Sequence, residues 1–244
     1  MDDSHGLVLK NVHFGYNEQP VLYVNHLALP EKGMVFITGP SGAGKSTLLE
    51  GLGLMTNSFI PSPEGNSKFE VKSEEINPRQ LWSSNSDSLS RIRREVFGFI
   101  FQSTNLMPNF TVGENIRMSA DDEMNDDILK EKINNLLKTL SLPMSILDKA
   151  PYHISGGQKQ RVAFARAMVS KFSIILADEP TGNLDYSNSI NLIGILKNFI
   201  EAENKLAIIV THHIELAKEF GDYMVKIEPG NHGVAVAKTE KIDH

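Results

Sequence analysis

The chain of 244 residues contains no cysteine, and no apolar run in it approaches the ~20 residues that a membrane-spanning helix needs. The missing cysteines exclude a disulfide framework, a cysteine-ligated zinc site and a cysteine nucleophile. The first residues, Met1 to His5, lack the basic and apolar regions of a signal peptide, so we expect neither export nor membrane insertion. Basic side chains number 24 against 30 acidic ones, and the net charge of −6 argues against a nucleic-acid coat as the main surface.

The composition, 41% hydrophobic and 22% charged, is that of an ordinary globular domain. Short apolar runs alternate with helical stretches, which is typical of a parallel sheet covered by helices. Three runs are apolar on both faces and predict buried central strands, at residues 34–37, 174–177 and 206–210. We therefore predict an α/β fold.

The remaining segments are less regular. Runs at residues 7–9, 12–14 and 21–24, which Gly15 and Pro20 interrupt, predict short strands of an antiparallel edge. Leucine and isoleucine recur with helical spacing between Leu129 and Leu140, after an acidic run that suits a helix N-terminus.

Two further segments lie between and after these elements. Residues 56–95 are rich in proline, serine and asparagine and predict a loop-rich surface excursion with one strand near Lys68 to Val71. The last residues, from Pro229 onward, predict a closing hairpin.

A glycine-rich loop follows the strand at residues 34–37 and precedes a helical stretch at residues 47–54. It reads Gly39-Pro40-Ser41-Gly42-Ala43-Gly44-Lys45-Ser46. Such a loop wraps its backbone N–H groups around a phosphate, the lysine adds charge at the terminal phosphates, and the serine hydroxyl is a ligand for Mg²⁺. The alternative is a simple glycine-rich turn, but the strand before and the helix after favour nucleotide binding.

An acidic pair, Asp178 and Glu179, ends the strand at residues 174–177. The carboxyl ends of parallel strands are where ligands of α/β sheets bind. There an aspartate can hold Mg²⁺ through water, and a glutamate can take a proton from an attacking water. Acidic residues after a strand are also common in turns and as helix caps. The pair alone therefore does not indicate a catalytic site, and the other motifs of the chain decide the interpretation.

A second glycine motif opens another helix, with Ser155 suited to the N-cap position before Gly156 and Gly157. Val162, Ala165 and Val169 then lie on one face of that helix. The motif provides a second helix N-terminus at which an anion could bind, although one nucleotide rarely needs two helix N-termini. A capped helix with a flexible entry is the alternative, and it leaves the doubled glycine unexplained.

The segment Ser155-Gly156-Gly157-Gln158, between a phosphate loop and an Asp-Glu strand end, resembles the signature of ATP-binding-cassette (ABC) ATPases. The resemblance extends over nearly the whole chain. It implies a P-loop NTPase fold of the ABC ATPase type: a mostly parallel core sheet flanked by helices, an N-terminal antiparallel β subdomain and a helical subdomain. Residues 1–244 would form a single domain, in which about 96–170 include the helical subdomain with the signature.

The same resemblance assigns expected roles to individual residues. Gln102 would touch Mg²⁺ and the attacking water, Asp185 would contact the dimer partner, His212 would contact the γ-phosphate, and Tyr16 would stack on adenine. The expected catalytic residues are Glu179, His212, Gln102 and Lys45, and the expected metal ligands are Ser46, Gln102 and Asp178. The expected nucleotide contacts are Tyr16, Gly39, Ser41, Gly42, Ala43, Gly44, Lys45, Ser46, Thr47, Ser155, Gly156, Gly157, Gln158 and Asp185.

Two positions depart from the family pattern. His213 stands where an aspartate usually follows the switch histidine, and Ile154 replaces the commoner leucine of the signature. The second change is a mild one of apolar shape. The first removes the carboxylate that the family usually has at this position, which leaves its replacement contact and the effect on dimer closure open. All groups expected to do chemistry are present, so an inactive cassette is a minor alternative.

The resemblance also implies cofactors, partners and location. Motifs such as Thr181-Gly182-Asn183-Leu184-Asp185 are similar to those of the lipoprotein-release, macrolide-export and cell-division group. This implies ATP and Mg²⁺, a homodimer that sandwiches ATP, and a separate integral membrane permease, with the chain in the cytoplasm, peripheral on the cytoplasmic face of the inner or plasma membrane. No nucleic-acid partner is expected. Residues 56–95 are longer and more polar than the group's usual β subdomain.

Two other functions use some of the same motifs. A soluble cassette protein could use ATP closure to clamp nucleic acid or a ribosome, although such proteins usually carry two cassettes or a long coiled-coil insertion. The basic group of Arg91, Arg93 and Arg94 is more typical of a solvated or interdomain surface than of a nucleic-acid site. A small-molecule kinase would share the phosphate loop but would have no use for the signature or for Asp185.

Overall fold

The computed structural model describes residues 5–62, 65–83, 87–230 and 234–242. Its strands are β1 (His5–Tyr16), β2 (Gln19–Pro30), β3 (Gly33–Thr38), β4 (Phe59–Pro61), β5 (Lys68–Val71), β6 (Glu74–Glu75), β7 (Phe97–Ile100), β8 (Ile174–Asp178), β9 (Leu206–Val210), β10 (Tyr223–Glu228) and β11 (Ala235–Lys241). Its α-helices are α1 (Lys45–Leu52), α2 (Pro78–Ser83), α3 (Asp87–Val96), α4 (Val112–Arg117), α5 (Asp126–Thr139), α6 (Gly156–Val169), α7 (Tyr186–Ala202) and α8 (Ile214–Phe220). Two 3₁₀ turns, η1 (Met144–Ile146) and η2 (Pro151–His153), lie between α5 and α6.

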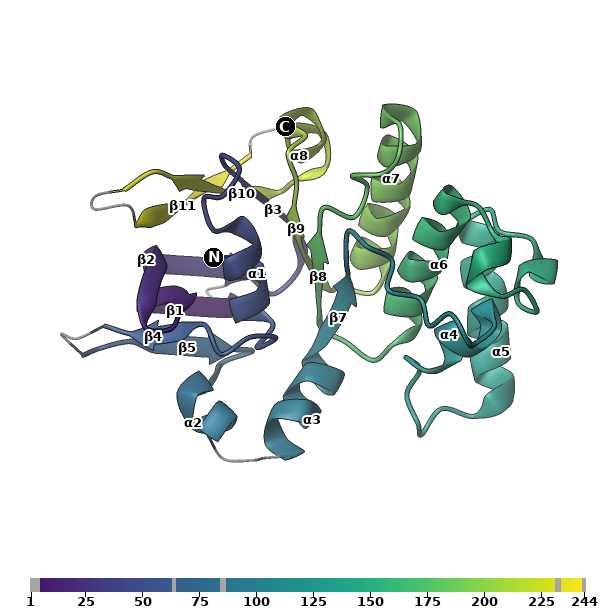
Figure 1. The fold of residues 1–244 in the computed structure, drawn as a ribbon, viewed down its shortest axis with the longest axis horizontal. Helices are drawn as coiled ribbons and strands as arrows, with labels where there is room; N and C mark the ends of the chain where they lie inside the picture. The colour runs from purple at the N-terminus through teal and green to yellow at the C-terminus, as the bar shows by residue number, and fades with distance from the viewer. Residues whose placement is uncertain (1–4, 63–64, 84–86, 231–233, 243–244) are drawn as a thin grey trace.

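All these strands join one mixed sheet, which in Figure 1 runs from β1 and β2 at the left to β8 and β7 in the middle of the molecule. Its order is β6-β5-β1-β2-β11-β10-β3-β9-β8-β7, with β4 paired to β1. The strands β10, β3, β9, β8 and β7 lie parallel to one another, whereas β1 pairs antiparallel with β2, β4 and β5. The predicted α/β class, with a mostly parallel core and an N-terminal antiparallel section, is confirmed.

The three predicted central strands are confirmed as β3, β8 and β9. Their side chains alternate between two cores because successive residues of a strand point to opposite faces. In β3, Met34 and Phe36 pack in the core that includes residues of α4 to α7, and Val35 and Ile37 pack in the core around α1. Burial of each such side chain stabilises the fold by about 1.5–3 kcal/mol.

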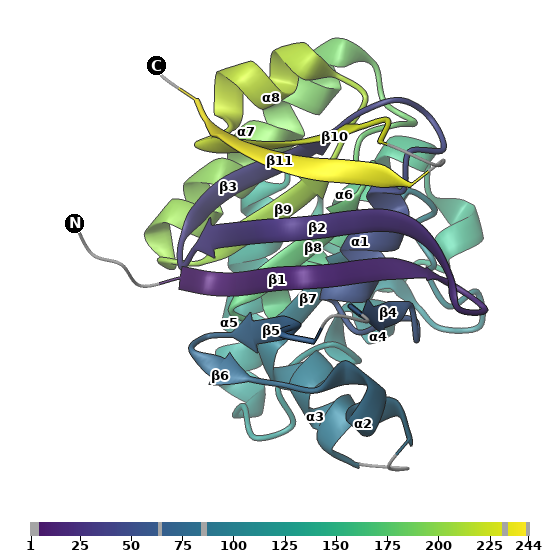
Figure 2. The ribbon, with the colours of Figure 1, turned by 90° about the vertical axis from the view of Figure 1, so that its left-hand side faces the viewer.

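The N-terminal strands are longer than predicted, and the expectation of short broken runs is wrong. β1 and β2 pair antiparallel from His5↔Pro30 to Tyr16↔Gln19, with register shifts only after His5 and after Phe14. Asn11 stays within β1 with a positive φ of 50°, and Pro20 sits beside the turn, where its missing N–H does no harm. Figure 2 shows this ladder facing the viewer, with β11 beside β2.

Residues 56–95 also differ from the prediction of a loop-rich excursion. The strand at Lys68–Val71 is confirmed as β5, but β4, β6, α2 and α3 add regular structure that the composition concealed. Leu89, Ile92 and Val96 lie three and four residues apart on α3 and pack against the core around α1. Part of the serine-rich stretch, residues 84–86, lies outside the described residues.

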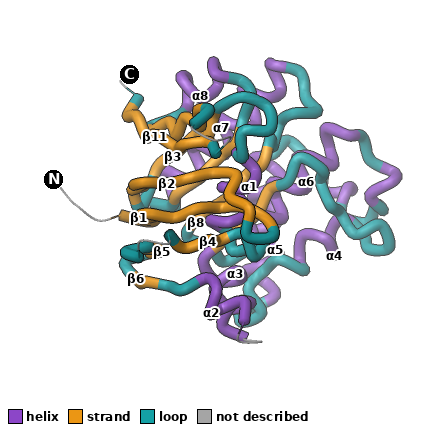
Figure 3. The backbone as a smooth tube through the Cα atoms, turned by 60° about the vertical axis from the view of Figure 1, so that its left-hand side comes forward, coloured by secondary structure: helices purple, strands orange, loops and turns teal. Residues whose placement is uncertain are grey.

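The helices α4, α5 and α6 gather at the end of the molecule away from β1 and β2 (Figure 1), and Figure 3 shows α4 and α6 on the side away from those strands. The helix predicted near Leu129–Leu140 is α5, with the acidic Asp126 and Asp127 in its first turn. The closing hairpin is confirmed as β10 and β11, while residues 231–233 of its turn are not described. Among the described residues no helix combines the length and the apolarity needed to cross a membrane.

Candidate functional site

The predicted phosphate loop lies between β3 and α1, at the edge of the sheet where β8 and β9 also end. Helix α1 begins at Lys45, two residues earlier than predicted. Gly39 has a φ of 150°, and a Cβ there would lie 2.5 Å from the carbonyl oxygen of Ile227, so only glycine fits. Gly44, the N-cap of α1, has a left-handed φ of 93°.

The ammonium of Lys45 is almost fully buried and turned back into its own loop. Its Nζ donates to the carbonyl oxygens of Gly39, at 3.0 Å, and Pro40, at 2.8 Å. The loop therefore holds one full positive charge at the N-terminus of α1, where the helix dipole also favours an anion.

Ser46 and Asp178 lie opposite each other across this edge of the sheet. The Ser46 hydroxyl donates to Oδ1 of Asp178 at 3.3 Å. Burial raises the pKa of Asp178; the Ser46 hydrogen bond and the charge of Lys45 lower it, and the charge of Glu179 raises it further. A half-buried carboxylate beside a hydroxyl is the oxygen donor set that Mg²⁺ prefers, so these residues fit the expected cation.

Oε1 of Glu179 and Nε2 of His212 are in direct contact across the ends of β8 and β9. Glu179 takes a positive φ of 43°, and its backbone N–H donates to the carbonyl of Val210 at 3.0 Å. A non-glycine residue in this conformation is strained, and such strain concentrates at functional sites. The carboxylate is thus turned toward His212 by its backbone.

Tyr16 stands at the end of β1, above the first turns of α1. Its hydroxyl lies 3.3 Å from Oγ1 of Thr47 and donates to Glu50 at 3.4 Å, and its side chain is 47% exposed. An exposed ring beside the phosphate loop can stack on a base. The pKa of Glu50 is raised by burial and then by the charge of Asp178.

Gln102 follows β7 and borders the same region. Its backbone carbonyl accepts a hydrogen bond from Asn183 at 3.3 Å, and its side-chain Nε2 lies 3.4 Å from where a Cβ of Gly182 would be. Both neighbours belong to the segment that follows Glu179. The loop beyond Gln102 is held by Arg166, which donates to the carbonyls of Thr104 and Asn105 at 2.9 and 2.7 Å.

The second glycine motif is built as predicted but lies elsewhere. Ser155 and Gln158 form a reciprocal capping box at the start of α6. Gln160, buried in α6, donates to the carbonyl of Pro180. Within the described chain, no hydrogen bond or ion pair joins residues 155–158 to residues 39–47, so the contacts of one copy do not link the two helix ends that were expected to bind anions.

Asp185 and His213 lie at neighbouring helix starts. Asp185 caps α7 and accepts from the backbone N–H of Asn188 at 3.0 Å; hydrogen bonds from Asn188 lower its pKa. The backbone N–H of His213 donates to Oγ1 of Thr211, and its ring lies 6.5 Å from that of Tyr186. The His213 ring, at the position that departs from the family pattern, therefore lies near an aromatic side chain.

Sequence reasoning missed two side chains that shape this region. Glu50 lies one helical turn beyond Ser46, a spacing of four residues that could have placed both on one face of α1. Arg166 gives no local signal, because its contacts are to carbonyls about sixty residues earlier in the chain.

A strand, a glycine-rich loop and a helix, with an acidic strand end opposite the loop serine, define a P-loop nucleotide-binding protein. The sequence pattern of the family described as ABC transporter matches residues 24–182. The chain belongs to the ABC transporter family, which confirms the expected ABC ATPase class.

Three comparisons illustrate the similarity. The chain is 34% identical to the uncharacterized ABC transporter ATP-binding protein MJ0796 of Methanocaldococcus jannaschii over 96% of both chains. It is 33% identical to the lipoprotein-releasing system ATP-binding protein LolD of Zymomonas mobilis over 88% of both. It also resembles the solved dimeric structure of a post-hydrolysis state of the MJ0796 cassette bound to ADP and Pi, with a TM-score of 0.75, 29% identity and coverage of 98% and 99%.

Proposed function

We propose that this chain is the ATP-hydrolysing subunit of an ABC transporter-type complex that drives a separate membrane permease. The observation that carries the proposal is the convergence of Lys45, Ser46, Asp178, Glu179 and His212 at one edge of the sheet. That arrangement suits binding of a nucleotide triphosphate and attack by water on its γ-phosphate.

In the proposed reaction Tyr16 stacks on adenine and residues 39–47 hold the phosphates. Glu179 accepts a proton from water while the water oxygen bonds to the γ-phosphorus and the bond to the β–γ bridging oxygen breaks, leaving ADP and phosphate. His212 holds the Glu179 carboxylate in place and contacts the γ-phosphate. Gln102 orients the water.

Ser46, Asp178 and Gln102 are the residues that would hold Mg²⁺. Bound there with the nucleotide, the cation would neutralise charge on the phosphate oxygens. The raised pKa of Asp178 is consistent with a carboxylate whose ionised form is best stabilised with a cation beside it.

Two copies would complete each ATP site. Ser155, Gly156, Gly157 and Gln158 of one copy would cover the ATP held by the phosphate loop of the other, with Asp185 at the dimer contact. This arrangement gives the doubled glycine of α6 a role that a single copy does not, and the related cassette described above was solved as a dimer. We treat residues 1–244 as one such cassette, in which about 96–170 include the signature helix.

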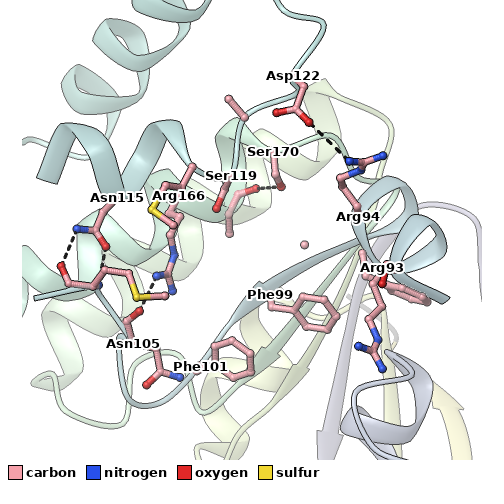
Figure 4. A pocket seen from close by; sticks show the side chains of 17 residues that line it. Arg93, Arg94, Phe99, Phe101, Asn105, Asn115, Ser119, Asp122, Arg166 and Ser170 are labelled. Atoms are coloured by element: carbon pink, nitrogen blue, oxygen red, sulfur yellow. Dashed lines mark hydrogen bonds and ion pairs between the residues drawn. The ribbon is translucent and has the colours of Figure 1, made fainter. Parts of the chain in front are cut away.

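The permease would dock at a cavity of about 650 Å³ between α3, β7, α4 and α6. In Figure 4, Phe99 and Phe101 lie between Arg166 on one side and Arg93 and Arg94 on the other. The two rings stack at 6.0 Å and give an apolar floor to a basic rim. Phe101 directly precedes Gln102, so the floor of the cavity continues into the catalytic region.

The lipoprotein-release, macrolide-export and cell-division group supplies the expected type of permease, and the similarity to LolD supports that branch. The chain would then work at the cytoplasmic face of the membrane that holds the permease. A soluble cassette acting on nucleic acid or a ribosome is the alternative. No observation on the described residues favours it over a membrane partner.

The test is a pull-down of tagged E179Q with Mg·ATP from membranes in mild detergent, with co-purifying chains identified by mass spectrometry. E179Q should recover a polytopic membrane protein, and E179Q that also carries M118E should not. Met118 lines the cavity and is 57% exposed, so a charge there would disrupt an apolar contact with the permease. M144E is the matched control, since Met144 is 46% exposed outside the cavity. Recovery of ribosomal or nucleic-acid material without a membrane protein would overturn the proposal.

A further inference from the structure

A second cavity lies behind the phosphate loop, on the side of the C-terminal hairpin. It measures about 670 Å³ and is bounded by the start of the loop, by α8 and by β10 and β11. Its volume falls within the range of about 300–1,000 Å³ that small-molecule sites occupy. Of its lining, the nucleotide binding proposed above uses Gly39, Pro40 and His212, and the proposed permease docking uses none.

The inner wall of this cavity is apolar. Met224 of β10 is almost fully buried beneath it, and Ile242 adds a partly buried side chain after β11; both belong to the core that includes residues of α4 to α7. Ile214, at the start of α8, lines the cavity and is 50% exposed. Such a wall favours a ligand with a compact apolar portion, because its binding removes apolar surface from water.

The charged groups at this cavity are unequally paired. Lys226 pairs with Glu240 at 2.6 Å, and Glu228 pairs with Lys238 at 2.6 Å. The ammonium groups of Lys218 and Lys241 also belong to the lining, yet neither makes an ion pair or hydrogen bond with the described residues. The cavity therefore has a local excess of positive charge in a chain of net charge −6.

Two walls of the cavity belong to the nucleotide site. Gly39 and Pro40 line it, and their carbonyl oxygens are the ones that hold the ammonium of Lys45. His212, the partner of Glu179, lines it as well. A ligand in this cavity would touch the backbone that positions Lys45 and the side chain that positions Glu179.

We propose that this cavity is a regulatory site for an amphipathic anion, a carboxylate or phosphate carried on a short apolar chain. The apolar chain lies against Ile214 and Ile242, and the anionic head lies between Lys218 and Lys241. Because the ligand and ATP share Gly39 and Pro40 as neighbours, each changes the affinity of the chain for the other.

The test titrates the full chain with octanoate and octyl phosphate by calorimetry, with octanol and octyltrimethylammonium as neutral and cationic probes of equal chain length. One anion should bind per chain, and the two anionic probes separate a carboxylate preference from a phosphate preference. The double variant K218E/K241E should weaken anion binding about tenfold or more by reversing the charge at the head position. The milder K218Q/K241Q serves if the charge reversal prevents folding.

The control K10E/K32E changes two exposed lysines away from the cavity and should bind the anion as the parent does. Saturating anion should also shift the dissociation constant for ATP in the parent and not in K218E/K241E. Equal binding of octanol or of the cation, or unchanged anion affinity in K218E/K241E, would overturn the site. An ATP affinity unaffected by bound anion would overturn its regulatory role.

Discussion

Asp178, the last residue of β8, and Glu179, which follows it, have different surroundings, and we expect them to have different chemical roles. Asp178 is half-buried opposite Ser46, whereas Glu179 turns through a strained backbone toward His212. The first is suited to hold a cation and the second to accept a proton. Substitution of each by its amide should therefore produce different losses.

E179Q should bind ATP and hydrolyse it about 10²–10⁴-fold more slowly, because the amide cannot accept the water proton. The measurement is steady-state ATPase activity beside the ATP dissociation constant. E215Q makes the same chemical change at an exposed position of α8 and should keep the parent rate. Hydrolysis by E179Q at the parent rate would show that Glu179 is not the proton acceptor.

D178N should stabilise the nucleotide-free protein at neutral pH. Burial raises the pKa of Asp178 in the folded state above its unfolded value, so the folded protein binds the proton more tightly and loses stability as the pH rises through this range. The variant does not titrate there, and its advantage should grow from acid to neutral pH. The free energy of unfolding in urea, measured across that range, checks this expectation.

D185N provides the contrast for D178N. Hydrogen bonds from Asn188 lower the pKa of Asp185, so its ionised form favours the folded state and its loss should matter above the lowered pKa. For the D178N variant, a free energy of unfolding that falls further below that of the parent as the pH rises would contradict the expectation. It would mean that the Asp178 carboxylate of the parent is better stabilised than its burial implies.

At the scale of elements, one buried amide holds the loop between β7 and α4. Asn115 donates to the carbonyls of Met107, Phe110 and Thr111 and accepts from the N–H of Met107. Its side chain is 1% exposed, so its removal leaves backbone groups without partners. N115A should lower the free energy of unfolding by about 2–3 kcal/mol.

Urea denaturation measures this loss, and N135A on the exposed side of α5 is the matched control. Alanine suits an exposed helical position, so N135A should change stability little or raise it slightly. Equal stability of N115A and the parent would show that the loop finds other partners for these groups.

The strands and helices differ in how far the sequence alone predicted them. β3, β8 and β9 were found within a residue or two of their bounds, because strands buried on both faces are apolar throughout. α3 was missed because its stability comes from tertiary contacts. Arg93 donates to the carbonyl of Leu54 at 2.8 Å and lies 4.8 Å from the centre of the Trp82 ring.

The candidate site shows the same division. The phosphate loop and the acidic pair could be predicted, since each is a short local motif beside a strand. The pairing of Glu179 with His212 joins residues over thirty positions apart, and no local spacing in the sequence predicts it. Arg166 was missed because its contacts lie about sixty residues away in the chain, whereas Glu50 could have been placed by its spacing of four residues from Ser46.

At the scale of the whole molecule, the two helices whose starts are proposed to bind ATP, α1 and α6, belong to different parts of the fold. Helix α6 lies among the helices away from β1 and β2, and α1 packs in the core next to those strands (Figure 1). The account therefore depends on a second copy whose α6 covers the phosphate loop of the first.

The most direct test cross-links these two surfaces between copies. Ser41 and Ser155 are both exposed, and the chain has no cysteine, so S41C and S155C each introduce a single reactive thiol. Both are made in the E179Q background, mixed, and treated with a short bis-maleimide with and without Mg·ATP. The account predicts a covalent dimer joined through positions 41 and 155 that forms in the mixture only with ATP. No such dimer with ATP, or equal amounts with and without ATP, would contradict a shared site.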